Sequence, residues 1–570
     1  MNFLLGGDIM NGVLMMVIAL VVLGGGYLTY GRWLAKTWGV DPNKKTPAYE
    51  FQDGVDYVPT STQVVFGHQF ASIAGAGPIN GPIQAAVFGW LPVLLWILVG
   101  GLFFGAVQDF GSIFASVKNK GKSIGYVVEL YLGKTGKRLF LLFVWLFSIL
   151  VVAAFGDIVA GTFGVGEGLT EAQSYSNGAT ATTSMLFICA AVGLGFFIKK
   201  GVSKKEWITT VVAIALLVIC VAIGLAAPMY VSKMTWLYLV FVYIFVASVV
   251  PVWALLQPRD YLNSFLLIFM IAAAVVGIFV YNPQMELASF NGFVVNGNGM
   301  FPFLFVTIAC GAVSGFHSLV SSADSSKQIK NEKDMLPIAF GSMLVESLLA
   351  VISLICVGAM AKGGVMPKGT PPIIFANAVA MFLAKLGVPS AASNTIITLA
   401  ISAFALTSLD SVARVGRLSF QEMFQDSKVP YEKQSKLVQF MQNKYFATVV
   451  TLILGFILAT NGYKNIWPLF GSANQMVSAL ALCAIAIFLK KTNRKGWMTW
   501  APMFIMLAVT FTALSQIVVK KIGLVGNAGF KFASDGMQLV FAVLLICLGL
   551  VIAFNSIKKL FFDKDEKAVA

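Results

Sequence analysis

Charged side chains are scarce in this sequence. Only 11% of its 570 residues are charged, whereas 58% are hydrophobic. A soluble globular protein usually has about a quarter of its residues charged, so the composition excludes that class. Apolar runs of roughly 20 residues recur along the chain, and each is long enough to cross a bilayer as a helix. The sequence therefore predicts an all-α polytopic membrane protein that lies in a lipid bilayer.

Residues for metal binding and catalysis are also few. The chain has six cysteines and two histidines. No pair of cysteines has metal-ligand spacing, and all six fall inside predicted spans, where small packing residues are the better interpretation. The sequence contains no HExxH motif, nucleophile elbow or nucleophile–base spacing, which disfavours an intramembrane enzyme. It also lacks the filter-like repeats and charged rings of a channel. We expect no catalytic residue, no metal site and no cofactor.

The basic residues gather in alternate loops. The formal net charge is +15, but most of the Lys and Arg residues fall in loops on one side of the predicted spans. This is the positive-inside bias of membrane proteins, so the basic character predicts no nucleic-acid partner. The bias orients the N-terminus outside and the C-terminus in the cytoplasm.

Two polar, glycine-rich stretches interrupt the apolar runs. The first is FGHQFASIAGAGPINGP, Phe66–Pro82, and the second is IACGAVSGFHSLVSSADSSK, Ile308–Lys327. Gly and Pro at this density open the hydrogen-bond ladder of a helix. The freed N–H and C=O groups survive in a bilayer only where they face protein or a water-filled cavity. Paired interrupted helices are the best pointer in a sequence to the binding site of a secondary transporter.

The predicted topology contains two similar groups of spans. We expect about 15 transmembrane helices, and each interrupted stretch opens a group of five. The first group starts inside and the second outside, which is the 5+5 inverted-repeat plan of LeuT/APC-like transporters. The predicted parts are an extra N-terminal span and cytoplasmic loop (1–62), the first repeat (63–228), an inserted hairpin and outer loop (229–300), the second repeat (301–490), and two C-terminal spans with a tail (491–570).

Five blocks of the sequence resemble the signature blocks of the carbon starvation (CstA) family. They are GHQFASIAGAGPINGP, QPRDYLNSF, CGAVSGFHSLVSS, TSLDSVARVGR and WPLFGSANQ, and they run in the same order from residue 67 to 475. The resemblance implies an uptake system of the bacterial inner membrane with a LeuT-type fold, expressed on nutrient limitation. It also implies pyruvate or small peptides as substrates, with protons as the expected coupling ion.

The chain departs from the family pattern at two places. Family members often carry His-Asp where this chain has Gln108-Asp109, and a Gly-Thr-Thr-like run where it has Ala323-Asp324-Ser325. Asp324 adds a negative charge near the predicted inner mouth, which could alter coupling or substrate preference.

The unwound backbone of the two stretches is the expected substrate site. Freed N–H groups there direct partial positive charge at a carboxylate, such as that of pyruvate or a peptide C-terminus. The alternative is that the glycines only permit close helix packing; the prolines beside the first break and the matching second break favour a site. The candidate substrate-binding residues are His68, Ser72, Gly75, Ala76, Gly77, Asn80, Gln84, Gly311, Ser314, Gly315 and His317.

Proton coupling is assigned to the two histidines and to acidic residues within spans. An imidazole titrates near pH 6.5, and His68 and His317 hold corresponding places in the two stretches. A neutral histidine hydrogen-bonded between helices is an equal alternative. Glu346 lies nearest the centre of its span, so it is the leading carboxylate candidate. Asp157 lies in the outer third of its span and could stand at an external gate.

Two other acidic residues, Asp109 and Asp410, lie near the inner ends of their spans. For both we prefer structural salt bridges with basic residues. Asp410 and Arg414, four residues apart on a predicted helix, are the example.

A hydroxyl pair, Thr407 and Ser408, offers a competing coupling ion. In LeuT-type sodium symporters, such a pair on the eighth core helix completes a sodium site with carbonyls of the first, and this pair has that place in the predicted topology. Oxygen ligands suit a hard cation, although hydroxyls that bond back to helix carbonyls are commoner. Sodium coupling is therefore the second hypothesis. The first is a proton-coupled importer of small carboxylates or peptides that works by alternating access during carbon starvation.

Overall fold

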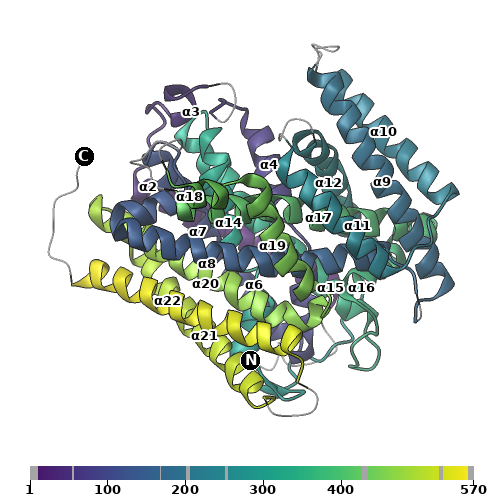
Figure 1. The fold of residues 1–570 in the computed structure, drawn as a ribbon. Coiled ribbons are helices and arrows are strands. Elements are labelled where there is room, and N and C mark those ends of the chain that lie inside the picture. The colour runs from purple at the N-terminus through teal and green to yellow at the C-terminus, as the bar shows by residue number, and fades with distance from the viewer. Residues whose placement is uncertain are drawn as a thin grey trace.

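The computed structural model describes residues 10–53, 57–166, 168–199, 206–250, 255–425, 434–525 and 530–562. These residues form a bundle of helices (Figure 1), as a bilayer requires, because a helix satisfies its own backbone hydrogen bonds. Ten of the described helices are long and apolar enough to cross a membrane, and four more apolar helices have 10–17 residues. The prediction of a helical, multi-pass membrane protein is confirmed. The predicted number of spans stays a prediction.

The first part of the chain begins with one long rod, interrupted only by a π-helical turn. Turns of π or 3₁₀ type carry the label η. The elements before the hairpin are α1 (Gly12–Gly26), η2 (Tyr27–Gly31), α2 (Arg32–Trp38), α3 (Pro47–Glu50), α4 (Thr62–Ile73), α5 (Gly77–Ala85), η3 (Ala86–Phe88), α6 (Trp90–Gly100), η4 (Gly101–Gly105), α7 (Ala106–Lys118), α8 (Ile124–Phe163), α9 (Glu171–Lys199), α10 (Glu206–Ala226), α11 (Lys233–Val249) and α12 (Leu256–Tyr281).

The second part starts with a small β-hairpin and then returns to helices. Its elements are β1 (Val294–Val295), β2 (Asn298–Gly299), α13 (Met300–Thr307), α14 (Gly315–Ala323), η6 (Ser325–Lys327), η7 (Glu332–Asp334), η8 (Leu336–Gly341), α15 (Ser342–Met360), α16 (Pro371–Ala384), α17 (Ser390–Phe424), α18 (Lys436–Met441), α19 (Lys444–Ala459), α20 (Tyr463–Lys491), α21 (Trp497–Ile522), η10 (Phe532–Gly536) and α22 (Met537–Phe561). The strands pair antiparallel, Val294 opposite Gly299.

Both glycine-rich stretches interrupt their helices, as their sequences predict. Residues 74–76 separate α4 from α5, and residues 308–314 separate α13 from α14. At the first break, Ala74 adopts φ −74° and ψ +70°, which is not helical. At the second, Ser314 is extended, with φ −133° and ψ +125°. Each interrupted helix therefore consists of two short helices that leave backbone groups free between them.

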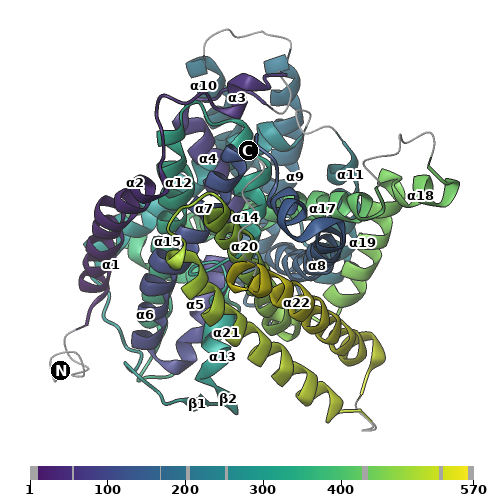
Figure 2. The same cartoon turned by 90° about the vertical axis from the view of Figure 1, so that its left-hand side faces the viewer.

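The core of the bundle lies around α20. The most apolar window of the Tyr463–Lys491 helix is 100% buried, whereas the corresponding windows of α21 and α22 are 44% and 39% buried. Accordingly, α21 and α22 lie together at one side of the molecule and α9 and α10 at another (Figures 1 and 2). The peripheral helices present apolar side chains outward, which suits contact with lipid.

Loops with opposite predicted sidedness lie at opposite ends of the bundle. In Figure 2, α3 lies near the top of the molecule and the β1–β2 hairpin lies at the bottom. The first belongs to the loop predicted to be cytoplasmic and the second to the loop predicted to be outside. The arrangement is the one that the charge bias requires. The chain ends, residues 1–9 and 563–570, lie outside the described residues.

Candidate functional site

The two breaks pack directly against each other. A Cβ on Gly77 would collide with Cys310, and a Cβ on Gly81 would lie 2.6 Å from the carbonyl oxygen of Thr307. A Cβ on Gly311 would likewise lie 3.7 Å from Cα of Pro78. At Gly81 only glycine allows such an approach of two backbones, whereas the Gly311–Pro78 distance is an ordinary van der Waals contact. The glycines therefore serve close packing, and the same packing brings the two unwound segments together.

His317 is the centre of a buried charged cluster beside the second break. It lies on α14, three residues after Ser314. Its Nδ1 is 3.0 Å from Oδ2 of Asp109 on α7, and its Nε2 is 3.2 Å from Oε2 of Glu346 on α15. All three side chains are fully buried. The Asp109 contact has hydrogen-bond geometry, while the Glu346 contact is close but poorly aligned, so it acts mainly through charge.

This cluster, Asp109–His317–Glu346, contains two residues that the sequence predicts for proton coupling, His317 and Glu346. For its third member, Asp109, the sequence predicts only a structural salt bridge. The expectation that Asp109 forms a salt bridge with a basic loop residue is wrong, because its partner is His317. No local sequence pattern records this contact, because the two residues are 208 positions apart. Asp109 follows Gln108, whose Nε2 donates to the carbonyl oxygen of Ser314 at 2.7 Å, so the two residues reach the same helix.

The start of α14 is held by polar side chains from α7 and α20. Gln108 Nε2 also donates to Oγ of Ser318 at 2.6 Å, and its Oε1 accepts from the Ser478 hydroxyl. Asn474 Oδ1 accepts the backbone N–H of Phe316 at 3.1 Å, and its Nδ2 donates to Oγ of Ser314 at 3.1 Å. One N–H at the start of this helix therefore already has an acceptor, in the position where a ligand carboxylate would bind.

The predicted substrate residues on α5 retain unpaired polar atoms. Asn80 Nδ2 donates to the carbonyl oxygen of Ala76 at 2.8 Å. Asn80 Oδ1 and Gln84 Nε2 are buried without a hydrogen-bond partner among the described residues. The two side chains are four residues apart, so they lie on the same face of the helix. An unpaired acceptor and an unpaired donor close together suit a polar ligand, because leaving them unpaired is costly.

The structure distinguishes the two histidines that the sequence places in parallel. His317 is fully buried in the charged cluster, whereas His68 is half-buried on α4 and makes no hydrogen bond or ion pair among the described residues. Its neighbour Gln69 is the residue that links α4 to the second interrupted helix. Gln69 Nε2 donates to Oγ of Ser321 at 2.8 Å, and Ser325 donates to Gln69 Oε1 at 2.6 Å. Asp324, beside Ser325, is exposed.

The hydroxyl pair on α17 divides between two partners. Ser408 Oγ is 3.4 Å from the carbonyl oxygen of Ser72, just before the first break, and a Cβ on Gly75 would lie 2.6 Å from the same hydroxyl oxygen. Thr407 Oγ1 instead donates to the carbonyl oxygen of Ala403 at 2.9 Å and accepts from Nδ2 of Asn263 at 2.6 Å. Only Ser408 thus lies against the first break.

Asp410 forms a buried ion pair with a helix far away in the sequence. Its Oδ2 accepts from Nη1 of Arg259, on α12, and from the hydroxyl of Tyr243 at 2.8 Å. The expected Asp410–Arg414 pair is wrong: Nη2 of Arg414 donates to the carbonyl oxygens of Ala247 and Val250 at 2.8 and 2.9 Å. Asp157, at the far end of α8, pairs with Lys233 at 2.7 Å.

The His317 cluster does not form a metal site. The two carboxylates lie on opposite ring nitrogens, so the three groups do not converge on one point. Within the described ranges, no three His, Cys, Asp or Glu side chains are arranged to hold a metal ion.

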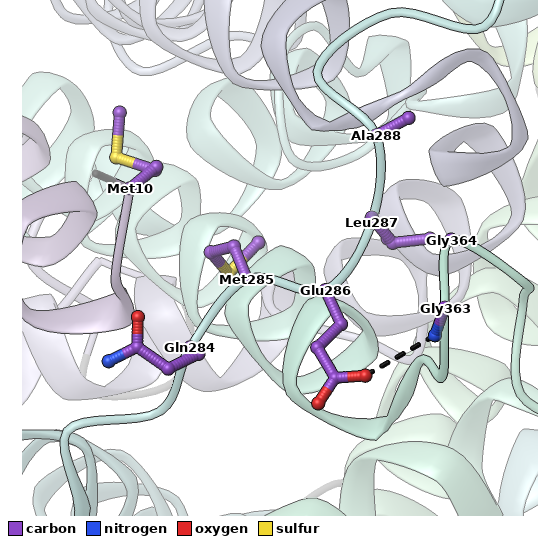
Figure 3. Close-up of a pocket in the computed structure, with 8 residues that line it drawn as sticks. All are labelled: Met10, Gln284, Met285, Glu286, Leu287, Ala288, Gly363 and Gly364. Carbon is purple, nitrogen blue, oxygen red and sulfur yellow. Dashed lines mark hydrogen bonds between the residues drawn. The ribbon is translucent and has the colours of Figure 1, made fainter. Parts of the chain in front are cut away.

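One cavity lies away from the breaks. It has a volume of about 460 Å³ and is formed by Met10, residues 284–288 and the turn Gly363–Gly364. Figure 3 shows the Glu286 side chain reaching toward Gly363, whose N–H it accepts at 3.4 Å. Loop backbone forms most of its wall, Glu286 itself is exposed, and no residue of either break lines it. This hollow is therefore not the candidate site.

A family model supplies the decisive comparison. The model described as "Carbon starvation protein CstA" matches residues 11–372 and 360–513. The chain belongs to the CstA family. The family assignment made from five sequence blocks is confirmed, and the family and its relatives are transporters, not enzymes.

Several named relatives are similar over most of the chain. The peptide transporter CstA of Bacillus subtilis is 32% identical, and the alignment covers 96% of this chain and 97% of that protein. The peptide transporter CstA of Escherichia coli is 30% identical, covering 89% of this chain and 81% of that protein. The pyruvate/proton symporter BtsT of Escherichia coli is also 30% identical, with 89% and 82% covered.

Solved structures give only distant likenesses. MhsT in complex with L-phenylalanine aligns with a TM-score of 0.49 at 14% identity, covering 87% of this chain and 99% of that chain. A mutant manganese transporter of Eremococcus coleocola aligns with a TM-score of 0.48 at 12% identity, with 89% and 99% covered.

Proposed function

We propose that this protein is a secondary active transporter that imports a small carboxylate or short peptide together with protons. The supporting observation is the fully buried Asp109–His317–Glu346 cluster beside the second break. Relatives support both substrate classes, since one is named a pyruvate/proton symporter and others are named peptide transporters. We place the protein in the bacterial inner membrane and its use in carbon starvation.

The charge of the cluster explains why it would carry a proton. With both carboxylates ionised, a neutral imidazole leaves two buried negative charges and a protonated one leaves a single negative charge. An uncompensated buried charge is costly. The cluster is neutral only when it holds one further proton, shared between the imidazolium and the two carboxyl groups. It would therefore bind a proton when closed and release it only when a path to water opens.

Substrate would bind where the two interrupted helices meet. The donors would be N–H groups at the breaks other than those of Ala74, Gly75, Ile308 and Val313, which already donate to backbone carbonyls. The unpaired Asn80 and Gln84 atoms add an acceptor and a donor. Because α14 carries both the second break and His317, proton release and substrate release would be linked through one helix. Movement of the five-helix repeats against each other, as in an inverted-repeat transporter, would expose this region alternately to each side.

Sodium coupling is the second candidate, and it rests on Ser408. Its hydroxyl lies 3.4 Å from the carbonyl oxygen of Ser72 at the first break. Hydroxyl and carbonyl oxygens are suitable ligands for a hard cation. The Thr407 hydroxyl would first have to leave Asn263 and Ala403, so we favour protons.

The test is uptake of labelled pyruvate and of labelled Ala-Ala into proteoliposomes under an imposed pH gradient, with and without sodium. We expect accumulation driven by the pH gradient and indifferent to sodium. H317A should abolish driven accumulation and leave counterflow exchange measurable, whereas H68A, which removes the other histidine of the chain, should leave accumulation above half of normal. Accumulation that persists in H317A would make His317 structural, and a requirement for sodium would move coupling to Ser408.

A further inference from the structure

A second cavity, of about 230 Å³, lies at the end of the bundle predicted to face outward. Its wall is built from the end of α8, the following loop, the first residue of α11, the start of α16 and the first residue of α20. Its lining includes two threonines, Thr162 and Thr370, and three further polar side chains: Asp157, Lys233 and Tyr463. None of them belongs to either break.

These three side chains are held very differently. Asp157 is fixed, because its Oδ2 accepts the backbone N–H of Tyr463 at 2.9 Å and its side chain is only 4% exposed. Lys233 pairs with the other carboxylate oxygen at 2.7 Å, but 49% of its side chain is exposed. A long side chain exposed to this extent can move away from its partner at little cost. The cavity therefore has a rigid anion and a movable cation.

The Tyr463 hydroxyl points to a missing partner. Tyr463 is 6% exposed and lines the cavity. Its hydroxyl is buried without a hydrogen-bond partner among the described residues. A buried tyrosine hydroxyl usually finds a partner, and leaving it without one costs free energy. A ligand in the cavity could supply that partner.

We propose that this cavity is an outer binding site for a small zwitterion, an amino acid or a short peptide, distinct from the site at the breaks. The ammonium group of the ligand would pair with Asp157 and its carboxylate with Lys233, which would move aside to admit it. The Tyr463 hydroxyl would donate to a carboxylate or carbonyl oxygen of the ligand. A simple anion such as pyruvate would gain Lys233 but would face the fixed Asp157 carboxylate, so the site selects zwitterions.

The size of the cavity suits such a ligand. Liquid water occupies about 30 Å³ per molecule, so the cavity has room for roughly seven waters. A ligand of about ten non-hydrogen atoms, such as Ala-Ala, has a comparable volume. A long peptide would not fit without further opening.

An aromatic layer separates this cavity from the breaks. Tyr463, Trp467 and Phe470 follow one face of α20, with ring centroids 6.2 and 5.0 Å apart. Trp467 Nε1 donates to the carbonyl oxygen of Thr307, at the edge of the second break, at 3.2 Å. Phe155, whose ring lies 5.7 Å from Phe470, would be 3.0 Å from a Cβ on Gly75. The cavity thus precedes the breaks on the outer side.

This inference rests on the proposed transport function for its purpose, but its test is local. T370C places a thiol in the cavity wall, and V365C places one on an exposed residue of the same loop outside it. Both variants are labelled with a membrane-impermeant maleimide, and the labelling of the parent protein is subtracted. The added compounds are Ala-Ala, alanine, N-acetyl-Ala-Ala and pyruvate.

We expect Ala-Ala or alanine to slow the labelling of T370C at least about fivefold. The compound that protects at the lower concentration shows whether the site takes a peptide or an amino acid. N-acetyl-Ala-Ala, which lacks the ammonium group, and pyruvate should have no effect, and V365C should never be protected. K233Q and Y463F should each raise the concentration needed for half-protection about tenfold, the loss expected for one hydrogen bond to a charged group. K521Q, which breaks the Lys521–Asp535 pair at the same end of the bundle, is the matched control.

Protection by pyruvate equal to that by the zwitterions would overturn the proposal. Protection of T370C that persists in both K233Q and Y463F would also overturn it. Such protection would be explained by ligand bound at the breaks and the closure that follows, not by ligand in this cavity. If T370C is protected but the parent protein shows no driven accumulation, proton-coupled transport is contradicted and the outer site stands. If the parent protein accumulates substrate but T370C is not protected, the outer site is contradicted and proton-coupled transport stands.

Discussion

Buried charges in this bundle obtain their partners from other helices. Asp410 meets Arg259, and Asp109 and Glu346 meet His317, with side chains at most 1% exposed in all three contacts. The Arg259–Asp410 pair is electrically balanced, whereas the cluster around His317 has one carboxylate too many. We therefore assign a structural role to the first and a proton-carrying role to the second. Substitutions at the two places should affect different measurements.

Replacing Arg259 tests the structural role. R259M leaves Asp410 buried without its cation, and breaking one partner of a buried pair costs about 3–5 kcal/mol. We expect a clear fall in the thermal unfolding temperature in detergent, with most of it recovered in the double variant R259M/D410L. K137M, which breaks the Lys137–Glu129 pair, whose side chains are each 23% exposed, should cost no more than about 1 kcal/mol. Equal losses in R259M and K137M would contradict this assignment.

Replacing Asp109 tests the proton-carrying role. D109N keeps the size of the side chain and its contact with His317 but removes the surplus negative charge, so the cluster no longer needs the additional proton. We expect accumulation driven by a pH gradient to fall at least about tenfold, a lower bound beside the roughly 10²–10⁴-fold that positioned proton transfer contributes in catalysis, while counterflow exchange continues. E286Q, at an exposed carboxyl in the surface hollow, should change neither. If D109N accumulates substrate at the normal level under a pH gradient, Asp109 has no part in proton coupling.

At the level of elements, the two interrupted helices act as one unit. Gly77 packs against the Cys310 side chain, and Gly81 packs against the Thr307 carbonyl. The second contact is between backbones, which cannot yield as a flexible side chain can. A shift of the backbone in one break must therefore displace the backbone of the other.

G81A tests this unit. Its added methyl group would lie 2.6 Å from the Thr307 oxygen, so the two helices must separate. We expect loss of at least nine-tenths of uptake and a lower unfolding temperature. G67A is the matched control, because a Cβ at Gly67 on α4 meets no atom within 4 Å. If G81A transports as well as G67A does, the close contact of the breaks is not required for transport.

At the level of the whole molecule, the two ends of the bundle should face different compartments. Lys44 belongs to the loop near α3, and Asn296 belongs to the turn between β1 and β2, at the opposite end (Figure 2). A membrane-impermeant maleimide added to intact cells should label N296C and should label K44C only after the membrane is opened. Labelling of K44C alone in intact cells would reverse the orientation that the positive-inside bias predicts.

Composition and local sequence by themselves determined the class and the places of interruption. Scarce charge and repeated apolar runs leave helices in a bilayer as the solution, and Gly and Pro act on the backbone within one turn of where they stand. For this reason the breaks at 74–76 and 308–314, and the family, were predictable from short stretches.

Only the tertiary structure decided which charges meet. Asp109 and His317 are 208 positions apart, and Arg259 and Asp410 are 151 apart, so no local pattern records either contact. Sequence reasoning treated His68 and His317 as equivalent because their neighbourhoods in the chain are similar. Their environments in space differ, since of the two only His317 contacts carboxylates among the described residues, those of Asp109 and Glu346. Contacts between distant residues depend on how helices pack, and packing is decided by the whole set of side chains at once.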